Sequence, residues 1–223
     1  MEYQAPIAGI LRYRDDLGQG VRTGVVFDGC PSACRLACHP VKGLIPLSRR
    51  MFSPLELAQI IKREDHDYLS DRVNVTLLGA DPVCYYQFVR ELIVLLEEEG
   101  LQTDLYSCLK APPEALFPLI GRVHLFTFTF LSLEPAAFRR FPWLSAKSAR
   151  ETLLKADQLA LPYRLRFSVI KGINEKEAEN FAIFSALLKN VKSVILDFPD
   201  PFFTKEEKEA FRAPFRKRGV ILY

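Results

Sequence analysis

Strand-like and helix-like segments alternate along most of this chain of 223 residues. The strand-like segments are short and apolar, and a segment of helical character follows most of them. They span residues 21–27, 73–78, 103–107, 123–131, 165–170 and 191–196. Parallel strands need a crossover connection, and a helix is the usual one, so this alternation predicts an α/β fold with a parallel sheet. An open sheet and an incomplete β/α barrel both satisfy the pattern.

Capping patterns mark where several of the expected helices begin. Ser53, with Pro and Glu after it, opens a helix that runs to about Lys62. Asp81 with Pro82 opens a longer helix, and Gly100 is its natural end. Further helices are expected at 113–120 and 145–159, after the segment 174–177, which caps the next helix, and after the capping segment 204–207.

Length and composition favour one domain, 1–223, because 49% hydrophobic residues suffice for a single core. The net charge is only +3 and no basic stripe is present, which argues against nucleic acid as a partner. No stretch approaches the roughly 20 apolar residues that span a bilayer, and the polar lead-in before Val21 lacks the pattern of a signal peptide. A cytoplasmic protein without a membrane partner is expected.

Three of the five cysteines lie within nine residues of one another, directly after the first expected strand. They are Cys30, Cys34 and Cys38, and His39 follows the last of them. Three thiolates on a short loop converge readily on one soft metal centre, so an iron-sulfur or zinc site is favoured. Zinc held by the three cysteines and His39, and small hydrophobic residues buried in a packed loop, are the alternatives. Ligands collect at the carboxyl ends of parallel strands, where this loop begins.

The segment from Gly20 to Pro31 resembles the opening of the glycyl-radical-enzyme activating enzymes of the radical SAM superfamily. That family has a G-P-G-x-R-T strand followed by F-x-G-C-x3-C-x2-C-H-N-P. Here G-Q-G stands at 18–20, R-T at 22–23 and C-H-P at 38–40. The fold that this resemblance implies is a partial (β/α)6 TIM-like barrel of the radical SAM type.

Two later motifs continue the resemblance in the same order. Residues 78–82, L-G-A-D-P, are similar to the family's S-G-G-E-P and are also followed by a long helix. Residues 165–174, L-R-F-S-V-I-K-G-I-N, are similar to its R-x-x-x-I-P-G-x-N turn. The resemblance therefore covers about residues 18–200.

The resemblance implies a 4Fe-4S cluster with Cys30, Cys34 and Cys38 as ligands to three irons, while the fourth iron binds S-adenosylmethionine (SAM). One electron from the cluster then cleaves SAM to a 5′-deoxyadenosyl radical. The SAM contacts expected on this basis are Gly79, Ala80, Asp81, Ser107 and Arg166. The implied partners are a glycyl-radical enzyme or another protein substrate, and an electron donor such as flavodoxin or ferredoxin.

Several of these residues also have a purely structural interpretation. Asp81 is equally well explained as the N-cap of the helix that follows it, and the alternative for Arg166 is a solvated or ion-paired structural residue. Cys84 and Cys108 are expected in the core, so a single cluster is predicted. The aromatic residues are likewise assigned to the core rather than to a cofactor platform; they are Phe126, Phe128, Phe130, Phe198, Phe202 and Phe203.

The chain departs from the family pattern at four points, and two of them, the cysteine spacing and Thr127 with Thr129, favour a second hypothesis. The cysteine spacing, C-x3-C-x3-C, is one residue longer than in the family, and no Asn follows the Cys-His pair. G-G-E has become G-A-D, and Thr127-Phe128-Thr129 stands where the family has D-x-K. The alternative is a non-catalytic relative that keeps an iron-sulfur or zinc site and acts as a binding or accessory protein.

Overall fold

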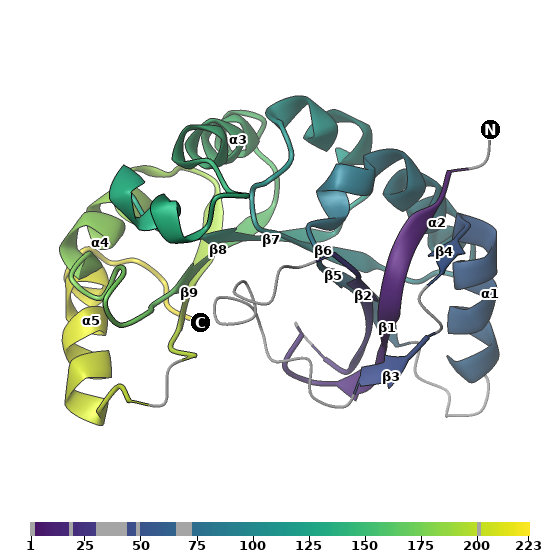
Figure 1. The fold of residues 1–223 in the computed structure, drawn as a ribbon, viewed down its shortest axis with the longest axis horizontal. Coiled ribbons are helices and arrows are strands. Elements are labelled where there is room, and N and C mark those ends of the chain that lie inside the picture. Colours follow the sequence, from purple (N-terminus) through teal and green to yellow (C-terminus); the bar gives the residue numbers. More distant parts are fainter. Residues whose placement is uncertain (1–2, 18–19, 30–43, 48–49, 66–72, 200–201) are drawn as a thin grey trace. The chain divides into compact units, whose positions relative to one another are not determined.

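The computed structural model describes residues 3–17, 20–29, 44–47, 50–65, 73–199 and 202–223 (Figure 1). The predicted metal ligands Cys30, Cys34 and Cys38 lie outside the described residues, as does His39. The chain divides into two compact units, and each is described by itself. The single domain over 1–223 stays a prediction.

The first unit is built on a mixed sheet. Its parallel strands lie where the sequence predicted them and are β2 (Arg22–Phe27), β5 (Asn74–Gly79) and β6 (Thr103–Ser107). Antiparallel strands extend the sheet beyond β2; they are β1 (Ala5–Arg14), β3 (Leu44–Pro46) and β4 (Met51–Phe52). The strand order is β3-β1-β2-β5-β6, and β4 also pairs with β1.

The interpretation of the residues before Val21 as a polar lead-in was wrong, because strand β1 lies among them. Ile7, Ile10 and Leu11 are buried on this strand, and Leu11 packs with Leu17 and Val26. Charged residues from Arg14 onward dominate the composition of the segment and hide the apolar alternation before them.

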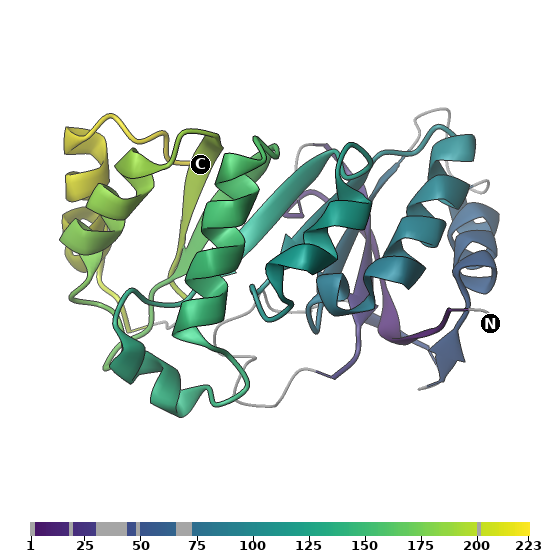
Figure 2. The same cartoon turned by 90° about the horizontal axis from the view of Figure 1, so that it is seen from above.

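The helices of the first unit lie where the sequence predicted them, although the long helix predicted after Asp81 begins with a 3-10 turn. They are α1 (Pro54–Asp65), the 3-10 turn η2 (Pro82–Tyr85), α2 (Tyr86–Glu98) and most of the 3-10 helix η3 (Pro113–Leu119). Ser53 and Glu56 form the predicted capping box: the Ser53 N–H donates to Glu56 Oε2 at 2.9 Å, and the Glu56 N–H donates to Ser53 Oγ at 3.3 Å. Figure 2 shows α1 and α2, which contact each other, side by side.

The second unit has three neighbouring parallel strands, with helices packed on one face (Figure 1). The strands are β7 (Leu125–Phe130), β8 (Tyr163–Ser168) and β9 (Val191–Asp197). The helices are η4 (Pro135–Arg140), α3 (Ala146–Gln158), α4 (Ala178–Leu187) and α5 (Lys205–Lys217). The ring of Phe167 on β8 stacks on that of Phe181 in α4, with 3.9 Å between the ring centroids. Its centroid lies 6.1 Å from that of Phe215 in α5.

Of three predictions about the second half of the chain, one needs correction, one holds in part and one is confirmed. Asn174 does not cap α4, because its side chain is buried and makes hydrogen bonds elsewhere. The helix begins after Glu177, without a side-chain cap. Phe126, Phe128 and Phe130 are core residues as predicted, but Phe202 is 77% exposed. The capping box predicted at Thr204 is present.

Cys84 also contradicts its predicted place in the core, since it is exposed in η2, while Cys108 is half-buried. Pro82 and Val83 occupy the buried side of η2, and Cys84 lies on its exposed side. No helix in the described ranges combines the length and the apolar composition that crossing a bilayer requires.

Candidate metal and cofactor site

The carboxyl ends of β2 and β5 meet where the cysteine segment begins. Phe27, the last residue of β2, lies opposite Gly79 in parallel register, and the Ala80 N–H donates to the Phe27 carbonyl at 3.1 Å. A Cβ built on Gly29 would lie 3.5 Å from that of Ala80. Because Cys30 follows Gly29 directly, the chain enters the cysteine segment beside the predicted SAM contacts Gly79 and Ala80.

Gly79 occupies a position that only glycine tolerates. Its φ of +102° lies in a region that side chains disfavour, and a Cβ would lie 2.4 Å from the carbonyl oxygen and 2.8 Å from the nitrogen of Phe27. The contacting atoms are backbone, so they cannot move aside as a flexible side chain would. The close approach of the two strand ends therefore depends on this glycine.

We expect Gly79→Ala to lower the free energy of unfolding by about 3 kcal/mol, the upper range for a strained backbone position. Gly121→Ala in the same unit is the matched control: its φ is +74° but nothing lies within 4 Å of its Cβ position. The control should lose only about 1 kcal/mol. Urea denaturation measures both variants, and equal losses would show that contact with Phe27 does not matter.

Asp81 has the structural role that the sequence analysis gave as its alternative. Its side chain is buried and accepts a hydrogen bond from the Val83 N–H at 3.3 Å, as the N-cap of η2. Its own N–H donates to the Gly79 carbonyl at 2.8 Å, in a left-handed conformation with φ 39°. Ser107 is buried at the carboxyl end of β6, the neighbour of β5. The first unit thus brings four of the predicted SAM contacts to adjoining strand ends.

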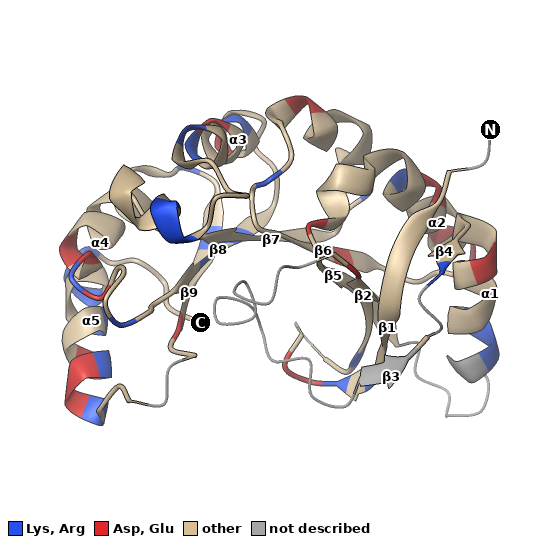
Figure 3. Cartoon of the chain, in the orientation of Figure 1, with Lys and Arg blue, Asp and Glu red and all other residues tan. Residues whose placement is uncertain are grey.

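Arg166, the fifth predicted contact, belongs to the second unit. Its side chain is 4% exposed and forms an ion pair with Asp197 at the end of β9. In parallel register, Thr127 lies opposite Arg164 and Thr129 opposite Arg166, so these four residues share one face of β7 and β8. Figure 3 shows the basic stretch of β8 and the acidic end of β9.

The turn after β8 joins the loops at the carboxyl ends of the neighbouring strands. The Asn174 amide donates to the carbonyls of Leu131, at 2.6 Å, and Ser168, at 2.9 Å, while its oxygen accepts from the Ile170 N–H at 2.7 Å. Lys171, which stands where the resembled family has Pro, donates to the Phe202 carbonyl at 2.7 Å. The motif residues of this turn therefore fix the loop geometry of the unit.

Glu177 adds a second link to the loop after β7. Its carboxylate accepts from Ser132 Oγ at 2.5 Å and from the Leu133 N–H at 2.8 Å. Burial raises the pKa of Glu177, and the hydrogen bonds from Ser132 and Leu133 oppose that shift. No local pattern indicates this contact, since Ser132 and Leu133 lie more than 40 residues from Glu177 in the sequence.

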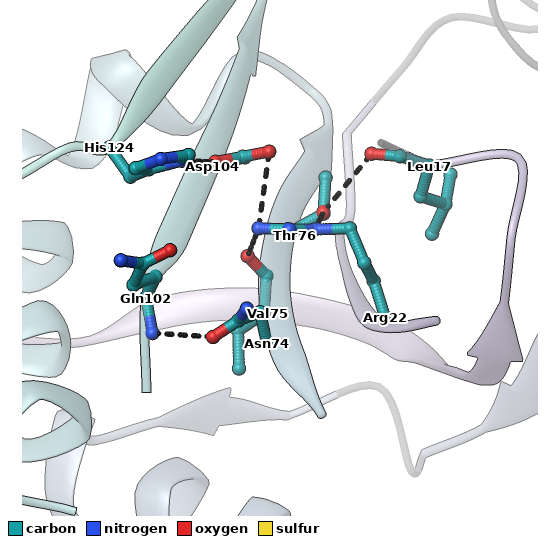
Figure 4. Close-up of polar contacts among 8 residues, drawn as sticks. All are labelled: Leu17, Arg22, Asn74, Val75, Thr76, Gln102, Asp104 and His124. Carbon is teal, nitrogen blue, oxygen red and sulfur yellow. Dashed lines mark hydrogen bonds and ion pairs between the residues drawn. The ribbon is translucent and has the colours of Figure 1, made fainter. Parts of the chain in front are cut away.

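A buried polar network at the opposite end of β2 also escaped sequence reasoning (Figure 4). Arg22 donates from Nε to Thr76 Oγ1 at 2.7 Å and pairs through Nη2 with Asp104 at 3.1 Å. Asp104 also contacts Nδ1 of His124 at 2.9 Å, which adds a fourth side chain to the network. The sequence feature that could have indicated this network is Arg22 itself, a charged residue in an otherwise apolar strand.

The comparisons with known proteins bear on the same residues. Residues 17–109 match a family described as a 4Fe-4S single cluster domain. Over 174 residues, 78% of this chain, the sequence is 24% identical to (2S)-3-sulfopropanediol dehydratase activating enzyme of Klebsiella oxytoca. The predicted resemblance to activating enzymes is confirmed. The chain spans 54% of the length of that curated relative.

Two solved structures show the fold. A domain of pyruvate-formate lyase-activating enzyme from Bacteroides vulgatus matches with a TM-score of 0.62 at 17% identity, covering 67% of this chain and 97% of that one. TYW1 with a lysine-pyruvate adduct bound matches with a TM-score of 0.53 at 16% identity, over 82% of this chain and 68% of that one. The α/β class and the partial β/α barrel are therefore confirmed, and the matched domain agrees with the predicted 4Fe-4S cofactor.

Proposed function

We propose that this chain holds one 4Fe-4S cluster through Cys30, Cys34 and Cys38, binds SAM, and installs a glycyl radical on a partner enzyme. The observation that carries the proposal is the position of Gly29, the last described residue before Cys30. Gly29 follows β2 and lies against Ala80 in the turn after Gly79, within the stretch that matches a 4Fe-4S single cluster domain. The resemblance to activating enzymes supports SAM as the second cofactor and an oxidoreductase activity.

The residues of the chain fit the two cofactors in different ways. Three cysteine thiolates suit an iron-sulfur cluster and leave one iron open for a further ligand. When bound, the cluster supplies one electron that cleaves SAM reductively. Gly79 and Ala80 keep side chains small where backbone groups can approach a ligand amino group, and Arg166 offers a cation for its carboxylate.

The partners remain part of the proposal. The chain is similar to a protein named as a dehydratase activating enzyme, which favours a glycyl-radical enzyme as the protein substrate. A flavodoxin or ferredoxin is the proposed electron donor. A non-catalytic accessory protein is the second candidate, because Arg166 already has Asp197 as a counter-ion and the cysteine spacing is one residue longer than in the resembled family.

Anaerobic reconstitution followed by reduction in the presence of SAM tests the proposal. We expect a broad visible absorbance that bleaches with dithionite, release of 5′-deoxyadenosine, and a carbon-centred doublet in the paramagnetic resonance spectrum of the cognate glycyl-radical enzyme. A colourless zinc protein would favour the accessory role. Efficient turnover of a free small molecule, with no stimulation by a protein partner, would contradict the proposed substrate.

A further inference from the structure

Asp197 fixes the charged end of Arg166 at the carboxyl edge of the second unit. In the parallel register of β8 and β9, Arg166 lies opposite Ile195, and Asp197 lies opposite Ser168. The ion pair therefore runs diagonally across the two strands. The Arg166 side chain is 4% exposed and the Asp197 side chain 26%, so the cation is buried while the carboxylate keeps contact with water.

The backbone of Asp197 is held on both sides. The Val169 N–H donates to the Asp197 carbonyl at 2.7 Å, which continues the hydrogen bonding of the sheet past the end of β8. The next residue, Phe198, packs its ring 5.2 Å from Phe203 and 5.8 Å from Phe211. Backbone pairing on one side and aromatic packing on the other leave Asp197 little freedom to move.

Arginine has five N–H donors in a planar fork, and the Nη2 bond to Asp197 leaves others for a second carboxylate. A buried guanidinium without a counter-ion is costly, so a fixed partner is needed before any ligand arrives. We propose that Asp197 is a positioning residue that orients Arg166 to bind the carboxylate of SAM. This role rests on the proposed function, because it requires SAM as the ligand.

The test measures SAM affinity by equilibrium dialysis of the reconstituted protein without reductant, so that SAM is not cleaved. Asp197→Ala should raise the dissociation constant on the order of tenfold, the effect of one charge-assisted hydrogen bond. Asp197→Asn should stay close to the parent, because its amide oxygen still accepts from Arg166. Glu209→Ala is the matched control, since Glu209 pairs with Arg212 and Arg216 on the surface of α5, and it should change nothing.

A double-mutant cycle separates positioning from a general loss of structure. If Asp197 acts through Arg166, Asp197→Ala adds little to the loss already caused by Arg166→Ala. Circular dichroism checks folding, and Asp197→Ser repeats the test if the alanine variant does not fold. Parental affinity in Asp197→Ala, additive losses, or an Asp197→Asn loss as large as that of alanine each overturn the positioning role alone. Absence of SAM binding by the iron-loaded parent overturns the proposed function together with this role.

Discussion

Alanine at Cys30, Cys34 or Cys38 is expected to remove most of the iron from anaerobically reconstituted protein. The parent should hold about four irons per chain, the content of one 4Fe-4S cluster. Each substitution removes one of only three thiolates, and two thiolates hold such a cluster poorly. Iron and sulfide analysis, together with the visible absorbance, measures the loss.

Cys84 and Cys108 provide the controls within the same chain. Cys84 is exposed in η2 and Cys108 is half-buried, and neither belongs to the cysteine segment. Alanine at either position should leave the iron content unchanged. Full iron content after loss of Cys38 would contradict the three-cysteine assignment, and loss of iron from Cys84→Ala would add a ligand that the sequence analysis excluded.

The sequence predicted those elements whose signal is local. The β-branched run of β2 and the capping residues Ser53 and Thr204 each act within a few residues, and the structure has strand and helices at those places. Asn174 stands in a sequence that also looks like a cap, yet its amide binds carbonyls of two other segments. Contacts across the fold decided the role of this residue, and they have no local signature.

In the candidate site, too, local features could be predicted from the sequence and contacts between distant segments could not. The strand-end position of Gly79 could be predicted, because a glycine after an apolar strand and before Asp-Pro is a local pattern. The contact that makes it indispensable involves Phe27, on a strand more than 40 residues earlier. Asp197 as the partner of Arg166 was equally hidden, since the register of β8 and β9 aligns them and no spacing in the sequence indicates it.

Replacing Arg22 by leucine should cause the largest loss of stability that the described residues indicate. The Arg22 side chain is 2% exposed and that of its partner Asp104 is 5% exposed. Arg22 also donates to Thr76 Oγ1 at 2.7 Å and to the Val75 carbonyl at 3.1 Å. Arg22→Leu takes the arginine counter-ion from the buried Asp104 carboxylate and leaves it the contact with His124. The variant should therefore cost about 3–5 kcal/mol of unfolding free energy, measured by urea denaturation.

Two variants show whether burial of the charge is the cause. Arg14→Leu breaks the Arg14 pair with Asp16 at the surface and should cost less than about 1 kcal/mol. Arg22→Leu combined with Asp104→Leu removes both charges, and it should recover part of the stability that Arg22→Leu alone loses, because no buried carboxylate is left without its arginine counter-ion. A double variant less stable than the single one would mean that the hydrogen bonds to Thr76 and Val75 matter more than the charge of Asp104.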